Sequence, residues 1–297
     1  MLVGVDRFGV TEEDFQNLAS GITHIFHGAW PMDFKVKVQS LEPQMRVVQE
    51  LLRLGQLAHN SKPTVRPRAV LASSIAVVGG YALKTRSCLV PVILMDDPET
   101  ALPIGYAEAK WVCEKVMESA YDNMKEVEPT IIRIGQLSGS RETGVWSCKE
   151  HLPALIKASQ AIGAMPDLQG IPVDQAAQVV SEILLGNGPR ELVYHLENPT
   201  RQPWSDVCSL IEHNTSFGSA RRMPFPQWLY QFSATGESSQ DLLDFFQNHF
   251  QRISSGILVL DTGKSKQISS TLRSVGVVPR NTIESYVRSW RTRGFVD

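Results

Sequence analysis

The sequence predicts an α/β fold, built on a parallel β-sheet and followed by a smaller, mostly helical region. The first observation is that short apolar runs, typical of strands covered on both faces, alternate with longer segments of helical periodicity. The second is that the pattern becomes helical and aromatic after Asn198. We therefore expect one domain over residues 1–196 and a second over residues 197–297, with residues 138–170 contributing to the second.

The elements of the first domain are expected in the order of a layered α/β structure. Helices are predicted at Thr11–Leu18, Glu42–Asn60, Gly105–Tyr121, His151–Ile162 and Gln175–Leu185. Strands are predicted at Thr23–His27, Ala69–Ala72, Pro129–Gly135 and Leu192–Leu196. Thr11 and Asp174 are the expected N-caps of the first and last of these helices. The sheet would then hold about four strands, with an apolar edge strand, Thr23–His27, which is a predicted liability for misfolding or association unless another chain covers it.

The composition argues against several classes of protein. The chain has 297 residues, of which 42% are hydrophobic and 20% charged, and a formal net charge of −2, as in an ordinary globular protein. The charge balance and the lack of basic runs argue against binding to nucleic acid or to a membrane surface. No signal peptide or transmembrane run is visible, so a cytoplasmic location is expected. The four cysteines are scattered, which favours reduced thiols over disulfides or a zinc site.

The chemistry of the sequence centres on Tyr106 and Lys110. They are four positions apart in a predicted helix, so both side chains emerge on one face. A neighbouring ammonium lowers the pKa of a phenol, and such a phenol can protonate a carbonyl oxygen near neutral pH. Ser73 and Ser74 follow an apolar strand, at the end where open α/β sheets bind ligands, and a serine hydroxyl there could hold the same oxygen. The alternative is that Tyr106 and Lys110 share a helix by chance and the serines only cap a loop.

Several other residues have structural or negative interpretations. His24 and His27 are three apart on a strand and face opposite sides, so no metal site is expected. Residues 79–103 form a loop too long for a bare connection, which is typical of a segment that covers a site. Arg133 is expected to be a structural charge near a strand end. The aromatic residues expected to form the core of the second domain are Trp204, Trp228, Phe245, Phe246, Phe250 and Trp290.

Three segments, in order along the chain, carry a resemblance to a known family: Arg68–Gly79, Leu102–Trp111 and Ile132–Gly139. They are similar to successive landmarks of the extended short-chain dehydrogenases/reductases. More narrowly, the chain resembles the terminal thioester reductase domain of fungal nonribosomal peptide synthetases, polyketide synthases and carboxylic acid reductases. The resemblance runs from Gly21 to the Trp290–Phe295 tail. It implies a Rossmann-like fold, with a partial NAD(P)-binding domain followed by a substrate domain.

The resemblance also implies an activity and a set of site residues. The implied reaction is NADPH-dependent reduction of a thioester on the phosphopantetheine arm of an acyl or peptidyl carrier protein, giving an aldehyde or alcohol in secondary metabolite biosynthesis. The implied catalytic residues are Ser74, Tyr106 and Lys110, with Ser73 as the fallback for Ser74. The implied cofactor contacts are His27, Ala29, Ser73, Tyr106, Lys110, Gly135 and Gln136, although Gln136 could be only a turn residue. The implied substrate contacts are Trp146, Glu150 and His151, which could instead only shape their loop.

A glycine-rich turn for the cofactor pyrophosphate is missing from this pattern. No Gly-x-Gly-x-x-Gly occurs in the sequence, and Val3–Thr11 resembles a segment that follows the first three strands of the family's sheet. We therefore expect an N-terminally truncated sheet, lacking about two to three βα units of roughly thirty residues each. The alternative function is a catalytically weak or silent reductase-like protein that acts as an accessory or carrier-protein-binding subunit.

Overall fold

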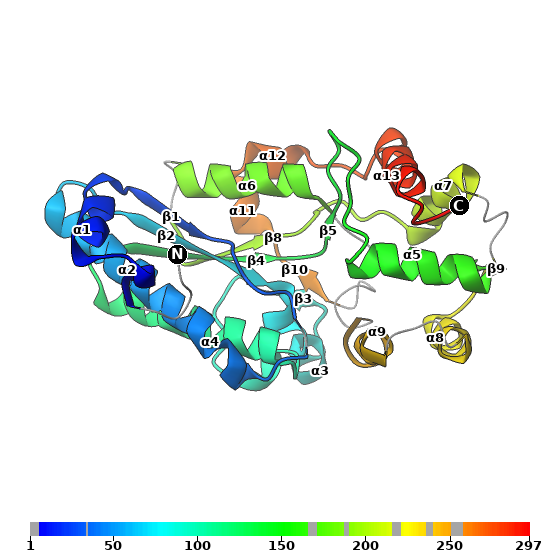
Figure 1. The fold of residues 1–297 in the computed structure, drawn as a ribbon, viewed down its shortest axis with the longest axis horizontal. Coiled ribbons are helices and arrows are strands. Elements are labelled where there is room, and N and C mark those ends of the chain that lie inside the picture. The colour runs from blue at the N-terminus through cyan, green and yellow to red at the C-terminus, as the bar shows by residue number, and fades with distance from the viewer. Residues whose placement is uncertain are drawn as a thin grey trace. The chain divides into compact units, whose positions relative to one another are not determined.

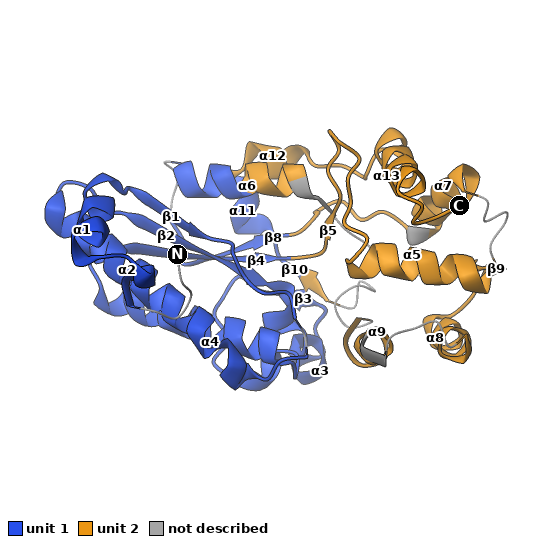
Figure 2. Ribbon diagram, viewed as in Figure 1, with its two compact units in different colours: residues 1–134, 180–196, 260–268 blue, residues 135–179, 197–259, 269–297 orange. Residues whose placement is uncertain are grey.

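The computed structural model of the protein describes residues 6–33, 35–165, 171–186, 190–215, 221–235, 240–250 and 258–297. The chain forms two compact units, shown in different colours in Figure 2. Unit 1 comprises residues 1–134, 180–196 and 260–268, and unit 2 comprises residues 135–179, 197–259 and 269–297. Unit 1 thus includes residues 260–268, which lie beyond residue 196 in the sequence. The domain boundary drawn from the sequence stays a prediction.

Unit 1 contains a four-stranded parallel sheet in the order β1-β2-β4-β8 (Figure 1). Its strands are β1 (His24–His27), β2 (Arg68–Ser74), β4 (Glu128–Ile134) and β8 (Val193–Leu196). The register places His27 opposite Leu71 and Ser74 opposite Ile134. In a parallel sheet the carboxyl ends of all strands meet at one edge, and His27 and Ser74 therefore end on the same side. The predicted parallel α/β sheet is confirmed.

The strands differ in burial as their sequences predict. The residues of β2 and β4 are buried or nearly so along their whole length, as expected of central strands covered on both faces. In β1, exposed and buried residues alternate, so His24 and His27 face opposite sides. β1 is also the last strand in the sheet order, and its Phe26 side chain is 46% exposed. In the described part of the chain, β1 is therefore an edge strand with one exposed apolar side chain.

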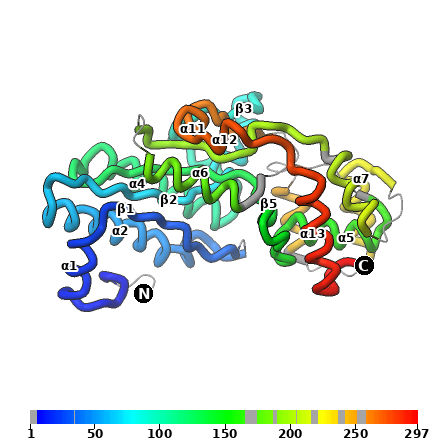
Figure 3. The backbone as a smooth tube through the Cα atoms, turned by 90° about the horizontal axis from the view of Figure 1, so that it is seen from above, coloured from blue at the N-terminus to red at the C-terminus, as the bar shows by residue number. Residues whose placement is uncertain are grey.

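Unit 1 contains helices that pack on its sheet and on one another. They are α1 (Glu12–Gly21), which packs on α2, and α2 (Glu42–Ser61), α3 (Tyr81–Thr85), α4 (Gly105–Asn123), the end of α6 (Val173–Leu185) and α11 (Gly263–Ile268). A cluster of apolar side chains from α2, α4 and the sheet, including Val48, Leu52, Leu71, Met117 and Ile131, forms the core. α2 and α4 lie on one face of the sheet and the end of α6 that belongs to unit 1 lies on the other (Figure 1). Figure 3 shows β1 and β2 side by side although α2 separates them in the sequence.

Unit 2 is mostly helical. Its elements are α5 (His151–Ile162), the beginning of α6, α7 (Trp204–Asn214), α8 (Phe225–Ala234), α9 (Gln240–Phe245), α12 (Ser270–Ser274) and α13 (Arg280–Thr292), with short strand pairs β5 (Leu137–Ser138) with β7 (Ile171–Pro172) and β6 (Ala164–Met165) with β9 (Arg221–Arg222). Trp228 stacks on Phe232 at 5.2 Å, and Phe246 contacts Phe250 at 4.9 Å. Phe232 is not among the predicted core residues. Five of the six that are predicted are buried, which confirms the aromatic core for Trp228, Phe245, Phe246, Phe250 and Trp290. The Trp204 side chain lies outside the described residues.

The N-cap expected from the sequence is present at α1 but not at α6. Thr11 Oγ1 accepts from the Asp14 backbone N–H at 3.1 Å, which confirms it as the N-cap of α1. The prediction for Asp174 is wrong, because α6 begins one residue earlier, at Val173. The Asp174 carboxylate accepts instead from the backbone N–H of Arg141 at 3.2 Å, across a loop. No helix in the described part of the chain is both long and apolar enough to cross a bilayer.

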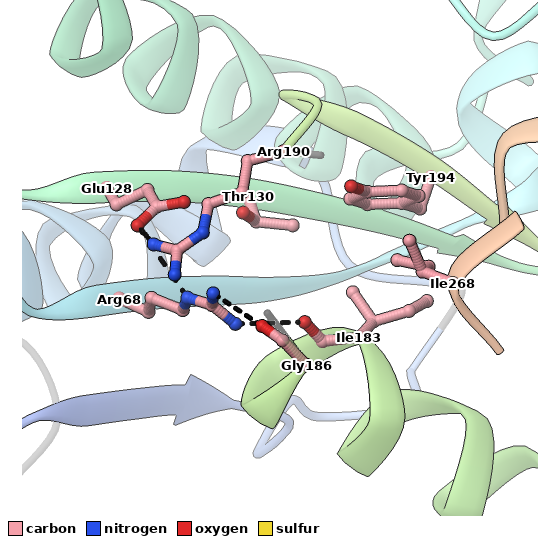
Figure 4. A pocket seen from close by; sticks show the side chains of 8 residues that line it. All are labelled: Arg68, Glu128, Thr130, Ile183, Gly186, Arg190, Tyr194 and Ile268. Atoms are coloured by element: carbon pink, nitrogen blue, oxygen red, sulfur yellow. Dashed lines mark hydrogen bonds and ion pairs between the residues drawn. The ribbon is translucent and has the colours of Figure 1, made fainter. Parts of the chain in front are cut away.

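At the amino ends of β2 and β4, a buried cation holds the end of α6 against the sheet (Figure 4). Arg68 is 6% exposed and donates to the carbonyl oxygens of Ile183, at 3.3 Å, Leu184, and Gly186, at 2.7 Å. These are carbonyls that a helix leaves without intrahelical partners. Arg68 also pairs with Glu128 at 3.6 Å. The hollow around them is lined by Arg68, Glu128, Thr130, Ile183, Gly186, Arg190, Tyr194 and Ile268, and we interpret it as a structural junction.

Candidate active site

Tyr106 and Lys110 lie on the first two turns of α4, whose start is fixed by a close backbone contact. A Cβ atom at Gly105 would come within 2.6 Å of the Val38 nitrogen and would also meet the Val36 carbonyl oxygen. Only glycine lets a neighbouring segment approach the helix start this closely. Residues four apart share a helix face, and both the phenol and the ammonium are buried on that face.

Ser74 is the last residue of β2, and it meets Tyr106 there. Its hydroxyl is hydrogen-bonded to the Tyr106 phenol and also accepts from the Ala76 backbone N–H at 3.2 Å. Lys110 Nζ donates to the carbonyl oxygen of Ala72, on the same strand, at 2.6 Å. The structure therefore brings together the three residues that the sequence indicated as catalytic. Their roles stay predictions.

Burial controls the pKa of both α4 residues. Burial raises the pKa of the Tyr106 phenol, and the hydrogen bond to Ser74, which lowers it, does not cancel this effect. The expectation of a lowered phenol pKa is therefore wrong, because the phenolate loses its hydration on leaving water. Burial lowers the pKa of the Lys110 ammonium to about 8, while the negative charge of Glu114 acts to raise it. Tyr106 therefore keeps its proton at neutral pH, and Lys110 titrates just above it.

A buried ion pair lies one helical turn beyond Lys110. Glu114 accepts from Arg133 Nη2 at 2.6 Å and from Nε at 3.0 Å, and it also accepts from the Ser73 hydroxyl at 2.5 Å. Arg133 donates further to the Ile93 carbonyl oxygen at 2.8 Å, which ties the loop before α4 to the sheet. Arg133 thus acts as the structural charge that the sequence predicted. The Ser73 hydroxyl is committed to this network, and its predicted cofactor contact stays a prediction.

The end of β1 and the residues after it form another side of the site. The Trp30 ring centre lies 3.9 Å from Lys110 Nζ, and the ring stands edge-on to Tyr106 at 6.4 Å and 87°. His27 is buried beside Trp30, with ring centres 6.0 Å apart, and burial, assisted by the charge of Lys110, lowers its pKa to about 4. In the described part of the chain, His27 Nε2 and Trp30 Nε1 are buried without a hydrogen-bond partner. Ala29 lies between them and is exposed.

Sequence reasoning missed two residues of this site, Glu114 and Trp30. Glu114 continues the buried face of Tyr106 and Lys110 by one more turn of the helix. An acidic residue at this spacing was the sequence signal that could have indicated a buried charge at the site. Trp30 directly follows the small-residue turn Gly28–Ala29, at a strand end that faces the predicted ligand edge. A large aromatic side chain at that point was a signal for a residue that enters the site.

Gly135 and Gln136 follow the carboxyl end of β4 and belong to unit 2. The Gln136 side-chain amide donates to the backbone carbonyl of Leu137 at 2.7 Å, as a turn residue does. Gln136 is therefore compatible with either interpretation made from the sequence, a cofactor contact or only a turn residue. The cofactor contacts of Gly135 and Gln136 stay predictions.

The three predicted substrate contacts pack inside unit 2. Trp146 is buried, its Nε1 donates to Glu150 Oε2 at 3.1 Å, and its ring meets Tyr286 at 5.2 Å. His151 stacks on Phe245 at 3.9 Å, and burial lowers its pKa to about 4. Burial raises the pKa of Glu150, against the hydrogen bond from Trp146. These contacts favour the alternative that the three residues shape their loop, and their substrate contacts stay predictions.

The residues of unit 1 fit one end of a nicotinamide cofactor. Tyr106 and Lys110 offer a hydroxyl and an ammonium for a ribose diol, and the unpartnered nitrogens of His27 and Trp30 lie beside them. No Gly-x-Gly-x-x-Gly occurs in the 297 residues to hold a pyrophosphate. Within the described ranges, no group of three or more His, Cys, Asp or Glu residues could hold a metal ion.

Comparisons with known proteins give relatives along most of the chain. A family model described as "Male sterility protein" matches residues 3–180. An adenylate-forming reductase of Aspergillus terreus is 39% identical over 302 residues, which cover 97% of this chain and 28% of the relative. A non-reducing polyketide synthase of Didymella fabae is 37% identical over 304 residues, which cover 97% of this chain and 12% of the relative. The chain therefore spans less than a third of the length of these curated relatives.

Solved structures show the same fold. The terminal R domain from the myxalamid PKS-NRPS biosynthetic pathway matches with a TM-score of 0.78 at 24% identity, over 99% of this chain and 75% of that chain. The PhqB reductase domain from Penicillium fellutanum matches with a TM-score of 0.64 at 15% identity, over 98% of this chain and 74% of that chain. The Rossmann-like fold expected from the sequence is confirmed.

Proposed function

Because the chain belongs to the male sterility protein family, we propose that it transfers hydride from NADPH to an acyl thioester on a carrier protein. The C–S bond then breaks and the pantetheine thiol leaves, which releases an aldehyde, and a second hydride transfer would give an alcohol. Membership of this NAD-binding family supports a nicotinamide cofactor. The observation that carries the proposal is the hydrogen bond between Ser74 and Tyr106, with Lys110 on the next turn of the same helix. A strand-end hydroxyl, a phenol and an ammonium are the groups that carbonyl reduction needs.

Ser74 and Tyr106 would act on the acyl oxygen. When bound, the nicotinamide supplies the hydride. Tyr106 keeps its proton because burial raises its pKa, so it acts as the acid that protonates the oxygen. The Ser74 hydroxyl, already hydrogen-bonded to the phenol, donates to the same oxygen as negative charge develops on it. The two hydroxyls thus stabilise the transition state more than the neutral carbonyl of the substrate.

Lys110 would hold the ribose and govern the charge around Tyr106. Its ammonium is fixed by the Ala72 carbonyl oxygen, 2.6 Å away. Because its pKa is about 8, it is mostly protonated at neutral pH and can donate hydrogen bonds to a ribose diol. Its positive charge also stabilises the phenolate that forms once Tyr106 has released its proton.

The curated relatives support the proposed class of substrate, a carrier-protein thioester. The adenylate-forming reductase and the polyketide synthase carry this segment as a small part of much longer chains. We infer an acyl or peptidyl carrier protein as the partner, with a phosphopantetheine thioester as the substrate, in secondary metabolism. The choice of NADPH over NADH follows the resemblance to thioester reductase domains.

A second candidate function is that of a weak or silent reductase-like accessory that binds a carrier protein. One observation favours it, the exposed Phe26 side chain on β1, which is the last strand in the sheet order of the described residues. A strand in this position offers such a subunit a place for β-sheet association with another chain.

Two measurements on the purified chain separate these functions. The first follows energy transfer from tryptophan to NADPH during a titration, and the second follows loss of NADPH absorbance with an acyl-pantetheine thioester. The reductase proposal expects saturable NADPH binding and thioester-dependent oxidation, with a weaker response to NADH. Binding of an acylated carrier protein without any NADPH oxidation would overturn the reductase proposal and favour the accessory.

A further inference from the structure

The Lys110 ammonium is nearly sealed from solvent and has few partners. Its residue is 2% exposed, and among the described residues Nζ has a single hydrogen bond, to the Ala72 carbonyl oxygen. A protonated lysine carries three N–H donors, and water normally satisfies those that the protein does not. At this site the place of water is taken in part by the face of the Trp30 indole, whose centre is 3.9 Å from Nζ. This distance is well within the range in which an aromatic face attracts a cation.

The same indole also contacts the phenol. Trp30 and Tyr106 meet edge-to-face, with ring centres 6.4 Å apart and planes at 87°, a favourable arrangement for two aromatic rings. Trp30 follows β1, whereas Tyr106 and Lys110 belong to α4, so one side chain joins the strand end to both reactive groups. A ring held on two sides in this way restricts the positions available to the ammonium.

We infer that Trp30 is a positioning residue of the candidate active site: its indole face holds the Lys110 ammonium in place, in its charged form, beside Tyr106. The catalytic consequence rests on the proposed function, but the coupling between the indole and the ammonium does not. Trp30 acts through Lys110 and Tyr106, and it needs no contact with the substrate.

The charged and titratable groups around Lys110 define what the indole must balance. Tyr106, Cys113 and Glu114 face it from α4, and His27 faces it from β1. The Glu114 carboxylate favours the ammonium, whereas burial opposes it. The Cys113 thiol is uncharged in this pH range, because burial raises its pKa to about 12. His27 is neutral above its own pKa of about 4 and so adds no repulsion at neutral pH. The indole face attracts only the charged form, so its removal should lower the pKa of Lys110 further.

The test measures the pKa of Lys110 directly, from the NMR chemical shift of its Cε, assigned with Lys110→Arg. Trp30→Leu removes the π face and should lower this pKa by about one unit. Trp30→Phe keeps a smaller π face and should restore most of the wild-type value. Trp30→Met replaces Trp30→Leu if the latter does not fold, as judged by circular dichroism.

Trp111 provides the matched control on the same helix. It directly follows Lys110, but its ring faces Lys115 at 5.7 Å and its Nε1 donates to the Met95 carbonyl oxygen. Trp111→Phe should therefore leave the pKa of Lys110 unchanged. An equal shift in the Trp111 and Trp30 variants, or no shift in Trp30→Leu, would overturn the inference.

Activity provides a second and separable readout. If the chain reduces thioesters, Trp30→Leu should move the alkaline limb of the rate profile to lower pH by the same amount as the pKa of Lys110, while Trp111→Phe should not. If the wild type reduces nothing, the proposed function fails, and the NMR titration still decides whether Trp30 holds the ammonium.

Discussion

Two buried cations lie at opposite ends of β2, and they are partnered very differently. Arg68, at the amino end, donates to three carbonyl oxygens at the end of α6 and pairs with Glu128. Lys110, beside the carboxyl end, has one hydrogen bond among the described residues and an aromatic face. The pKa of Lys110 falls to about 8 as a result of burial.

This difference separates a structural cation from one suited to chemistry. A guanidinium whose donors are occupied by fixed carbonyls contributes to stability and has little capacity to bind anything else. An ammonium with few partners is costly to bury, yet it titrates near neutral pH and retains donors for a ligand. The two ends of one strand therefore serve stability and function separately, and substitutions at each end should show it.

The largest effect is expected from Tyr106→Phe. Loss of the phenolic proton should reduce thioester reduction by about 10²–10⁴-fold, while the free energy of unfolding changes little, because the ring remains. Steady-state rates and urea unfolding of the same preparation measure both quantities. Unchanged turnover would remove Tyr106 from the mechanism.

Arg68→Met should have the opposite effect to Tyr106→Phe, lowering stability while leaving activity unchanged. It leaves the carbonyl oxygens at the end of α6 and part of Glu128 without a partner, which should cost about 2–4 kcal/mol of stability. Activity per folded molecule should stay the same, since Arg68 lies at the amino end of the strand. Arg190→Met is the control, because its side chain is half exposed and pairs with the same Glu128. Equal losses in both variants would contradict the role given to Arg68.

Lys110→Met should stabilise the protein while abolishing activity. The buried ammonium is disfavoured in the folded state below its folded pKa of about 8, and this cost disappears as the pH rises past the unfolded value of 10.5. After the lost hydrogen bond and π contact are deducted, the gain near neutral pH should be about 1–3 kcal/mol. Denaturant unfolding at about pH 7 and about pH 10 should show the advantage shrinking with pH. A constant difference between these pH values would contradict the assignment.

The smallest change in stability is expected for Phe26→Lys at the edge of the sheet. The side chain is exposed, so the free energy of unfolding should change by about 0.5 kcal/mol or less. A charge on an exposed edge strand disfavours pairing with another chain. Light scattering of concentrated samples should therefore show less association than in the wild type, whereas Tyr230→Lys, at an exposed aromatic position on α8, should leave association unchanged.

Much of the fold could be predicted from the sequence because its signals are local. The apolar runs of β2 and β4 and the helical periodicity of α2, α4 and α5 place these elements within about two residues of their observed ends. The spacing of Tyr106 and Lys110 and the position of Ser74 at a strand end likewise follow from local geometry.

What sequence reasoning missed depends on contacts between distant segments. The position of Trp30 against Lys110 requires the register of β1 with β2, and the contact of Arg68 with α6 joins residues more than a hundred positions apart. The sign of the Tyr106 pKa shift could not be read from its neighbour in the helix, because burial, a property of the whole unit, outweighs it. Asp174 is a residue type favoured at N-caps, but its carboxylate accepts a hydrogen bond from the Arg141 backbone N–H, which is distant in the sequence.

Gly105 has a consequence for how this reductase-like scaffold can diversify. Because the backbone at Val36 and Val38 presses on its α-carbon, even a methyl group there would push α4 away from the strand tips. The helix carries the phenol on its very next residue, so a shift of the helix would pull the proton away from Ser74. We therefore expect position 105 to accept no side chain larger than the hydrogen atom of glycine, because any Cβ there would disturb the placement of Tyr106.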